Sequence, residues 1–260
     1  MKFSEIEHFL LQDDFEAVGR ITTASNGALL LKSKDHINLR AIFKPKIGIR
    51  KLWDFPKDDL IEREMASYLL SKTSGLNLIP PTAIREIEPF GEGMIQFWIE
   101  NSQLTAVKLF SPEKMDTRYI EVLQANDSKG ELVSVAALNS SWMDSIILFD
   151  AVVNNSDRKA SHILTEESGQ MWAIDHGVTW HRESKLRTIL WSRVAEGLSL
   201  EHINLLDTLI ETLNIESVRL ESLLSHDEVQ MAIKRAESIR TTRSFPEPPQ
   251  EWPAIPWPIF

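Results

Sequence analysis

The fold is decided by two neighbouring stretches of sequence, FDAVVNNSDRKASHIL at residues 149–164 and WAIDHG at residues 172–177. Residues 163–164 and 171–174 are apolar, and the run between them, EESGQ at 166–170, has the composition of a turn. Two short apolar runs that flank such a turn are typical of a β-hairpin. The sequence therefore predicts a short hairpin between the two stretches.

Three polar side chains are expected at the open end of this hairpin. His162 and Asp175 lie opposite each other if the strands pair about the centre of the turn, and Asp157 arrives from the preceding loop. Two carboxylates about 4 Å apart repel by roughly 4 kcal/mol at an effective dielectric near 20. A cation between them relieves this repulsion, and magnesium commonly uses one or two carboxylates together with substrate phosphates. The pattern predicts a divalent-cation site, although aspartate is also common at ordinary turns and strand ends.

The two stretches resemble the catalytic segment of the phosphatidylinositol 3-/4-kinase family, and in particular small bacterial members of it. That segment reads approximately Asp-Arg-x-x-x-Asn and two hydrophobic residues, then a hairpin, then Ile-Asp-Phe/Asn-Gly. The matching residues here are DRKASHIL at 157–164 and IDHG at 174–177. The resemblance covers about residues 15–200, and shorter matches are Ser25-Asn26, Phe43-Lys44-Pro45, LWDFP at 52–56, Arg63-Glu64, PPT at 80–82 and KLRT at 185–188.

The resemblance implies an α+β, two-lobed protein-kinase-like fold with a small antiparallel-sheet N-lobe and a mainly helical C-lobe. It implies that Asp157 is the catalytic-loop aspartate and Asp175 the metal-binding aspartate, with ATP and Mg²⁺ or Mn²⁺ as cofactors. His162 takes the second metal-ligand position, where the family has Asn. Imidazole is a softer ligand than an amide oxygen and favours manganese or a transition metal more than Asn does.

The same resemblance assigns nucleotide contacts in the N-lobe. Lys44 ends a predicted strand, where kinases place the lysine that contacts the α- and β-phosphates. Helical periodicity leaves both Glu62 and Glu64 open as its partner, and the resemblance favours Glu64. Ser25 and Asn26 lie in the first hairpin turn and can offer side-chain donors to phosphates in place of a glycine-rich loop. An ordinary turn and a solvated surface lysine are the alternatives.

The remaining assignments concern the hinge and the catalytic loop. The apolar strand at residues 93–100 is the implied hinge, where Gln96, Phe97 and Trp98 meet the adenine or pack in the core. Arg158 is expected to brace the catalytic loop by pairing with a nearby carboxylate. Further candidates are Lys185 and Arg187 as contacts for an anionic substrate.

Periodicity and turn signals predict the other elements. Helices are expected at residues 2–12, 58–73, 132–138, 142–153, 199–213, 215–224 and 226–241, and strands at 17–23, 28–31, 37–43 and 93–100. The N-lobe is placed at residues 1–100 and the helical C-lobe at 101–244. Residues 245–260 form a tail rich in proline and tryptophan, which we expect to pack on the domain because exposed tryptophans are costly. A disordered ligand for a partner is the alternative.

Composition limits the function classes. A chain of 260 residues with a net charge of −10 has no cysteine, so disulfides and thiol chemistry are excluded. The acidic balance argues against general affinity for nucleic acid or anionic membranes. No secretory signal or apolar run of about 20 residues is visible, so no integral membrane association and a cytoplasmic location are expected. Composition does not indicate an oligomeric state.

Together these observations predict an ATP-dependent phosphotransferase, a kinase, with a protein or small-molecule acceptor favoured over a lipid. Three alternatives stay open. The histidine at position 162 and the sparse glycines suggest a nucleotide-binding pseudokinase, and a relative that transfers AMP uses similar parts. A metal-dependent phosphohydrolase would use the Asp/His cluster without Lys44. A zinc site at His162, His176 and His181 is disfavoured because their spacing matches no standard zinc motif.

Overall fold

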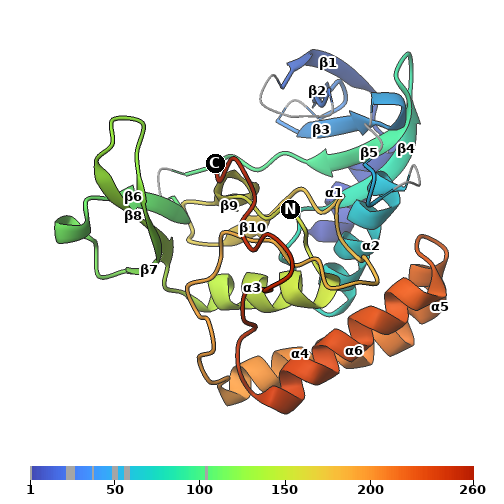
Figure 1. The fold of residues 1–260 in the computed structure, drawn as a ribbon. Coiled ribbons are helices and arrows are strands. Elements are labelled where there is room, and N and C mark those ends of the chain that lie inside the picture. Colours follow the sequence, from blue (N-terminus) through green and yellow to red (C-terminus); the bar gives the residue numbers. More distant parts are fainter. Residues whose placement is uncertain (1, 22–26, 37, 49–51, 56–58, 103–104) are drawn as a thin grey trace.

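The computed structural model describes residues 2–21, 27–36, 38–48, 52–55, 59–102 and 105–260 (Figure 1). Its N-terminal part contains the following helices and strands: α1 (Phe3–Gln12), β1 (Phe15–Arg20), β2 (Leu29–Ser33), β3 (Arg40–Pro45), the 3₁₀ turn η1 (Lys46–Gly48), α2 (Leu60–Thr73), β4 (Thr82–Ile87) and β5 (Gly91–Phe97). The strands form one antiparallel sheet in the order β1-β2-β3-β5-β4. The strand predicted at 37–43 begins three residues later and ends two residues later than expected, at Pro45, where β3 still pairs with β5.

Alternation along β3 decides which side chains face the site. Ala41 and Phe43 are buried in an apolar cluster with Ile6 and Leu10 of α1. Successive strand residues point to opposite faces, so Ile42 and Lys44 share the other face of the sheet. The apolar face of α1 therefore covers one side of β3 and leaves the side that carries Lys44 for the interior between the two parts of the chain.

The C-terminal part begins with a second sheet where helix was predicted. It contains β6 (Val107–Phe110), the 3₁₀ turn η2 (Pro112–Lys114), β7 (Tyr119–Asn126) and β8 (Leu132–Leu138), paired antiparallel in the order β6-β8-β7. The helix predicted at 132–138 is wrong. Valines at 133 and 135 suit a strand, and Gly130 takes a φ of +80° in the turn that returns the chain from β7. Figure 1 shows this sheet projecting from the rest of the molecule.

The helix predicted at 142–153 and the hairpin predicted after it are both observed. The remaining elements are α3 (Ser141–Val153), the 3₁₀ turn η3 (Ala160–His162), β9 (Ile163–Thr165), β10 (Met171–Ala173), α4 (Leu200–Ile215), α5 (Ser217–Glu221) and α6 (His226–Thr242). The Ser140 hydroxyl caps α3 by accepting the N–H of Met143, so this helix begins where a standard cap is available. The helices predicted at 142–153, 199–213 and 226–241 are confirmed within two residues at each end, while the one predicted at 215–224 is shorter.

Two apolar cores hold the molecule together. The smaller lies between α1 and the five-stranded sheet. The larger joins α3, the hairpin, α4 and α6, and it includes Ala66, Leu69 and Leu70 of α2. Helix α2 thus packs into the larger core although its sequence lies between two strands of the first sheet. Figure 1 shows α2 between that sheet and α3.

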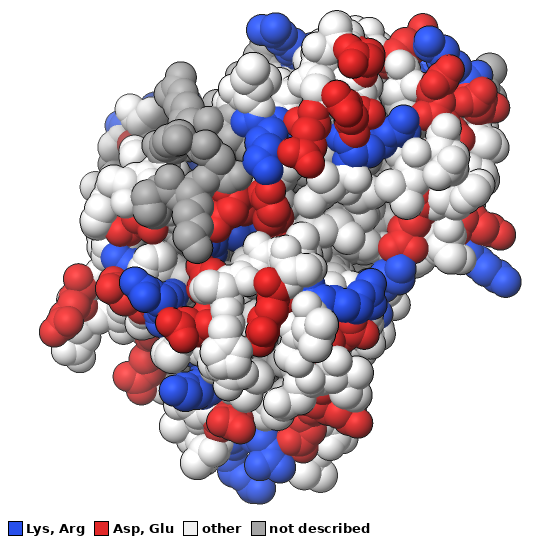
Figure 2. Space-filling view, turned by 90° about the vertical axis from the view of Figure 1, so that its right-hand side faces the viewer, with Lys and Arg blue, Asp and Glu red and all other residues white. Residues whose placement is uncertain are grey.

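Acidic and basic groups are interspersed on the face shown in Figure 2, with no continuous basic patch. Within the described residues, no helix combines the length and the apolar character that crossing a membrane requires.

Candidate functional site

Lys44 is the centre of a partly buried charge cluster. Its Nζ lies 2.5 Å from Oε1 of Glu64 in α2 and 2.8 Å from Oδ1 of Asp175, which follows β10. The neighbouring Glu62 pairs instead with Lys46, so the structure resolves the choice that periodicity left open. Three elements that are distant in sequence therefore meet at one amine.

One glycine makes this approach of the strands possible. Gly93 of β5 pairs with Pro45, the residue after Lys44, and a Cβ at this position would come within 2.5 Å of the Lys44 carbonyl oxygen and of the Phe43 ring. Such contacts are shorter than atoms tolerate, so a larger residue would push β5 away from β3. We infer that glycine is needed here for close packing of the strand that carries Lys44.

The charges of this cluster set each other's ionisation. Burial acts to lower the pKa of Lys44, but Asp175 and Glu64 outweigh it and hold the amine charged. Burial also opposes ionisation of Asp175, yet Lys44 and His162 outweigh it, and the pKa of its carboxyl lies well below the ordinary value. For Glu64 burial dominates and raises the pKa of its carboxyl. One ammonium thus faces two carboxyl groups, and of these Asp175 stays ionised, which suits a cation.

His162 lies next to Asp175, as predicted, although the register of the hairpin is shifted by one residue. Ile163 pairs with Ala173, so His162 faces Ile174 and Asp175 is the next residue along. A φ of +61° at Asp175 turns the chain there, and Nε2 of His162 lies 3.3 Å from Oδ2 of Asp175. Left-handed backbone at a residue other than glycine is uncommon and concentrates at functional sites.

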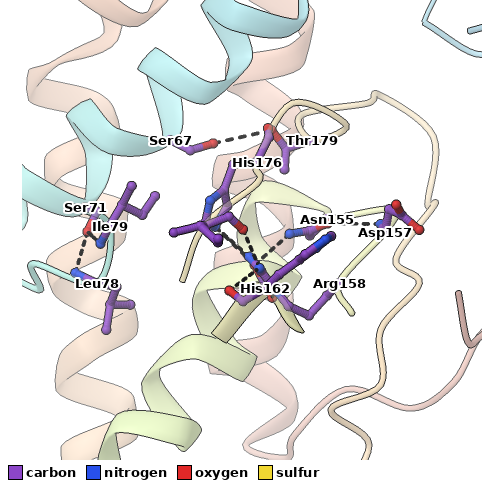
Figure 3. Close-up of polar contacts among 12 residues, drawn as sticks. Ser67, Ser71, Leu78, Ile79, Asn155, Asp157, Arg158, His162, His176 and Thr179 are labelled. Carbon is purple, nitrogen blue, oxygen red and sulfur yellow. Dashed lines mark hydrogen bonds and ion pairs between the residues drawn. The ribbon is translucent and has the colours of Figure 1, made fainter. Parts of the chain in front are cut away.

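The loop that leaves α3 is held by a buried ion pair. Arg158 makes two hydrogen bonds with Asp150 of α3, at 2.6 and 2.9 Å, and its side chain is fully buried. The same guanidinium donates to the Ile174 carbonyl oxygen at 2.6 Å and lies 2.8 Å from Nε2 of His176 (Figure 3). Arg158 thus joins the loop to the segment around Asp175, which is the bracing contact expected of it.

Asp157 directly precedes Arg158 in this loop. The Oδ1 of Asn155 accepts the N–H of Asp157 at 3.0 Å (Figure 3). Its own carboxylate lies 3.0 Å from Nζ of Lys159 and 3.5 Å from a guanidinium nitrogen of Arg187. No direct contact of Asp157 with Asp175 or His162 is found among the described residues. The predicted convergence of the three side chains is thus not seen as direct contact, but the charge of Asp157 still acts on His162, where it opposes the lowering of the imidazole pKa.

An apolar cavity of about 220 Å³ adjoins the charge cluster. It is lined from the sheet by Ile21, Ile42 and Phe97, from the following linker by Trp98, Ile99 and Asn101, from the hairpin by Leu164 and Ile174, and also by Gln96. Ile42 is on the Lys44 face of β3 and Ile174 precedes Asp175. The amide of Gln96 donates to Thr82 of the neighbouring strand and is thus already engaged. The predicted hinge residues Gln96, Phe97 and Trp98 are therefore brought together beside Lys44 and Asp175.

The remaining sequence-predicted residues are Ser25, Asn26 and Lys185. Ser25 and Asn26 lie outside the described residues. Lys185 is buried and pairs with Asp54 at 3.2 Å, with Nζ 3.8 Å above the ring of Trp252. Its charge is satisfied within the fold, so the structure does not support Lys185 as a contact for an anionic substrate.

Sequence reasoning missed two polar residues that touch the catalytic loop. Asn155 receives the N–H of Asp157 and donates to Asp150, and Lys159 pairs with Asp157. A signal for both existed in the sequence, since each stands two residues from Asp157 in a loop already singled out. The apolar residues Ile42, Leu164 and Ile174 carried no such signal, because a residue that lines a cavity looks like core.

The site fits one divalent cation through few protein ligands. No group of three His, Asp or Glu side chains able to hold a metal occurs in the described parts of the chain. Asp175 fits a magnesium-like ion that takes further ligands from phosphates. His162 is neutral at pH 7, because burial lowers its pKa to about 4. Its Nε2 lies 3.3 Å from Oδ2 of Asp175, so the tautomer with the ring proton on Nε2 donates to Asp175. Ligation by Nε2 requires that proton to move.

Comparison with known proteins places the chain in a family. No model of a known protein family matches it. Protein Rv2133c of Mycobacterium tuberculosis (strain ATCC 25618 / H37Rv) is 33% identical over 273 residues, which cover 100% of this chain and 98% of that protein. This chain belongs to the same family as Protein Rv2133c. That relationship extends over the whole length, so both parts of the fold and the tail belong to the family.

Solved structures show what fold the family has. The crystal structure of the Golgi casein kinase matches with a TM-score of 0.51 at 11% identity, over 92% of this chain and 75% of that one. The same kinase with Mn/ADP bound matches with a TM-score of 0.51 at 12% identity, over the same shares of the two chains. At this identity the likeness concerns the fold alone. The predicted α+β fold of protein-kinase type, with a sheet-rich N-terminal and a helical C-terminal region, is confirmed.

Proposed function

We propose that the protein is an ATP-dependent phosphotransferase, and that its nucleotide binds between the five-stranded sheet and the hairpin. The observation that carries this proposal is Lys44 held between Glu64 and Asp175, next to an apolar cavity that Ile42 of the same strand and Ile174 line. An apolar cavity beside a charged, phosphate-seeking amine suits a purine nucleotide, with the ring in the cavity and the phosphates at the amine. The Golgi casein kinase, similar in fold, has been solved with Mn/ADP bound, which supports a nucleotide and a divalent cation as ligands.

In this proposal each residue of the cluster has a separate task. Lys44 binds the α- and β-phosphates, and Glu64 holds the amine in place. Asp175 would hold the divalent cation, with His162 as hydrogen-bond donor to Asp175 or, after its ring proton moves, as second ligand. When bound, the cation neutralises charge on the transferred phosphoryl group. Arg158 keeps the loops of Asp157 and Asp175 together.

Asp157 is the proposed acceptor for the proton of the substrate hydroxyl. Its carboxylate lies 3.0 Å from Nζ of Lys159 and 3.5 Å from a guanidinium nitrogen of Arg187, which hold it in place. Phosphoryl transfer of this kind depends mainly on positioning and charge neutralisation. On the Asp157–Gly177 motifs we place the protein nearest the phosphatidylinositol 3-/4-kinase type, with a protein or small molecule as acceptor rather than an inositol lipid.

The test is label transfer from ATP, with Lys44→Met as the decisive variant and Lys46→Met as its matched control. Lys46 is the neighbouring ion-paired lysine, held by Glu62 and Glu92 outside the cavity. ATP labelled in the γ-phosphate reports phosphoryl transfer, and ATP labelled in the α-phosphate reports transfer of AMP. We expect γ-label transfer by the wild type and by Lys46→Met, and a loss of at least about 100-fold in Lys44→Met. Equal activity of Lys44→Met and wild type would favour the metal-dependent phosphohydrolase instead.

A second candidate is a nucleotide-binding protein without transfer, favoured by His162 at the position where the resembled family has Asn. With Nε2 of His162 3.3 Å from Oδ2 of Asp175, an imidazole that donates to this carboxylate leaves Asp175 as the single ligand for a cation. ATP binding without any label transfer, in magnesium or in manganese, would identify this candidate. Substitution His162→Asn restores an amide at that position and would then be expected to give measurable transfer.

A further inference from the structure

The tail, residues 245–260, lies against the segments that surround Asp157. Figure 1 shows it leaving α6 and returning across the molecule, to end beside the hairpin of β9 and β10. The Ala254 carbonyl oxygen accepts both the N–H of Thr188 and the indole N–H of Trp191, each at 2.9 Å. Further along, the Ile259 carbonyl oxygen accepts the N–H of Ala160 at 2.9 Å. The expectation that the tail packs on the domain is therefore correct for its backbone.

The tail contacts the catalytic loop directly at Ala160, and indirectly through the segment at 187–189. Ala160 begins η3, between Asp157 and His162. Thr188 lies in a segment that pairs with Arg158, because the N–H of Arg158 donates to the Arg187 carbonyl oxygen and the N–H of Ile189 donates to the Arg158 carbonyl oxygen. The tail, the segment at 187–189 and the loop thus form three adjacent layers of backbone.

The middle layer also reaches Asp157 through a side chain. Arg187 donates to the Ser156 carbonyl oxygen at 2.8 Å and lies 3.5 Å from the Asp157 carboxylate. Any displacement of residues 187–189 therefore moves the Arg187 guanidinium, which faces the Asp157 carboxylate. The tail limits such displacement at Thr188, while its bond to Ala160 holds the other side of Asp157.

Buried anchors fix the tail at its beginning and in its middle. Phe245 is buried, and its N–H donates to the Glu196 carbonyl oxygen at 2.8 Å. The Lys185 ammonium lies 3.8 Å from the centre of the Trp252 ring and also pairs with Asp54, at 3.2 Å. Cation–π contacts with a desolvated cation are among the stronger ones. The tail therefore has a defined path.

We propose that the tail is a positioning element of the active site, which holds Asp157 and His162 in place through Ala160 and the segment at 187–189. Its catalytic consequence depends on the function proposed above. In the described residues, no tail side chain lines the apolar cavity or pairs with Lys44, Glu64 or Asp175. The tail should consequently affect turnover and leave nucleotide affinity unchanged.

We call the hydrogen bonds that the tail makes with Ala160, Thr188 and Trp191 the clamp. The substitution Ala160→Pro tests the first of them. Proline has no N–H to donate to the Ile259 carbonyl oxygen, and it is tolerated at the first position of a helical turn. The preceding residue, Lys159, has φ −94° and ψ 162°, which is the conformation that a following proline requires. The matched control is Trp257→Phe, which changes an exposed side chain of the tail and leaves the N–H of Ala160 intact.

Three measurements separate this proposal from the proposed function. Amide hydrogen exchange at residues 157–162 reports loop order without any activity, and we expect it to be about five-fold faster in Ala160→Pro, as for the loss of one hydrogen bond. The rate of γ-phosphate release from ATP should fall about 10- to 100-fold, with an unchanged dissociation constant for an ATP analogue. Trp257→Phe should match the wild type in all three measurements.

Each contrary result has one meaning. Unchanged exchange at 157–162 in Ala160→Pro overturns the clamp, and so does an increase in turnover, which would make the tail a barrier to the acceptor. Absence of ATP turnover in the wild type overturns the proposed function, while the exchange measurement still decides the clamp. If Ala160→Pro does not fold, Trp191→Phe and deletion of residues 256–260 carry the same test. Trp191→Phe removes one of the two hydrogen bonds to the Ala254 carbonyl oxygen, and the deletion removes the bond from Ala160 to Ile259.

Discussion

At the scale of single residues, the site depends on buried ion pairs whose partners cannot be removed singly. Asp150 and Arg158 are both almost fully buried and share two hydrogen bonds. Burial opposes ionisation of Asp150, but Arg158 outweighs it and the pKa of the carboxyl lies below its ordinary value. Removing one partner of a buried pair typically costs 3–5 kcal/mol, roughly, because the other charge stays buried alone.

Asp150→Asn is therefore expected to lower the free energy of unfolding by about 3–5 kcal/mol at pH 7. A carboxyl with a lowered pKa stabilises the fold above its unfolded-state pKa of about 3.9, and that contribution is lost as the pH falls below it. The difference between wild type and variant should consequently be constant from about pH 7 to 5 and shrink below about pH 4. Urea unfolding across this range measures it. A difference that grows on acidification would contradict the assignment.

Asp157→Asn tests the proposed proton acceptor. We expect turnover to fall by at least about 100-fold, or about 2.7 kcal/mol of barrier, with little change in nucleotide affinity. The reason is that Asp157 faces Lys159 and Arg187 and not the Lys44 cluster. Single-turnover kinetics together with analogue binding provide the measurement. Wild-type turnover in the variant would show that another group accepts the proton.

At the scale of elements, α2 is fixed to the C-terminal helices. The side chain of Arg63 bonds to Glu228 of α6 at 2.6 Å and to the Thr179 carbonyl oxygen at 2.7 Å. On the next turn, Ser67 accepts the indole N–H of Trp180 and lies 3.3 Å from the Thr179 hydroxyl (Figure 3). Since Glu64 is part of this helix, the same contacts hold the partner of Lys44.

Arg63→Met is expected to cost about 3–5 kcal/mol of stability, because it leaves the buried carboxylate of Glu228 unpaired. It should also weaken nucleotide binding, since α2 carries Glu64. Arg240→Met is the matched control. It removes an exposed pair with Asp207 between α4 and α6 and should cost no more than about 1 kcal/mol. Denaturant unfolding and analogue titration of both variants check this, and equal losses in the two would argue against a special role for Arg63.

At the scale of the whole molecule, the apolar cavity is lined from both cores. Ile42 belongs to the sheet that covers the smaller core, whereas Ile174 follows the hairpin of the larger one. A ligand that fills the cavity is therefore bound to both parts at once. Ligand binding to the native state alone stabilises it by mass action.

A non-hydrolysable ATP analogue at 100 times its dissociation constant should stabilise the protein by about 2.7 kcal/mol. The stabilisation should appear as slower amide exchange on both sides of the cavity, in β3 and in the hairpin. The Lys44→Met variant, measured at the same analogue concentration, should show a smaller shift in Tm. Protection confined to one side would mean that the nucleotide binds elsewhere.

Much of this organisation was readable from local pattern. The helix before the catalytic loop, the hairpin after it and the long C-terminal helices follow from periodicity and turn composition, which act over a few residues. The proximity of His162 and Asp175 follows from the pairing of one short hairpin. The strand at 132–138 was missed because an alanine-rich run such as VAAL suits both states, and its pairing with β7 decides in favour of the strand.

What the sequence by itself determined is the set of local elements and the chemistry of the residues at their ends. Tertiary structure alone decided that Lys44 and Asp175, 131 positions apart, share a hydrogen bond, that Arg63 meets Glu228, and that the tail reaches Ala160. It also decided that Asp157 pairs with Arg187 of a later segment. The physical reason is that burial and charge pairing depend on which distant segments pack together, and no local periodicity encodes that choice.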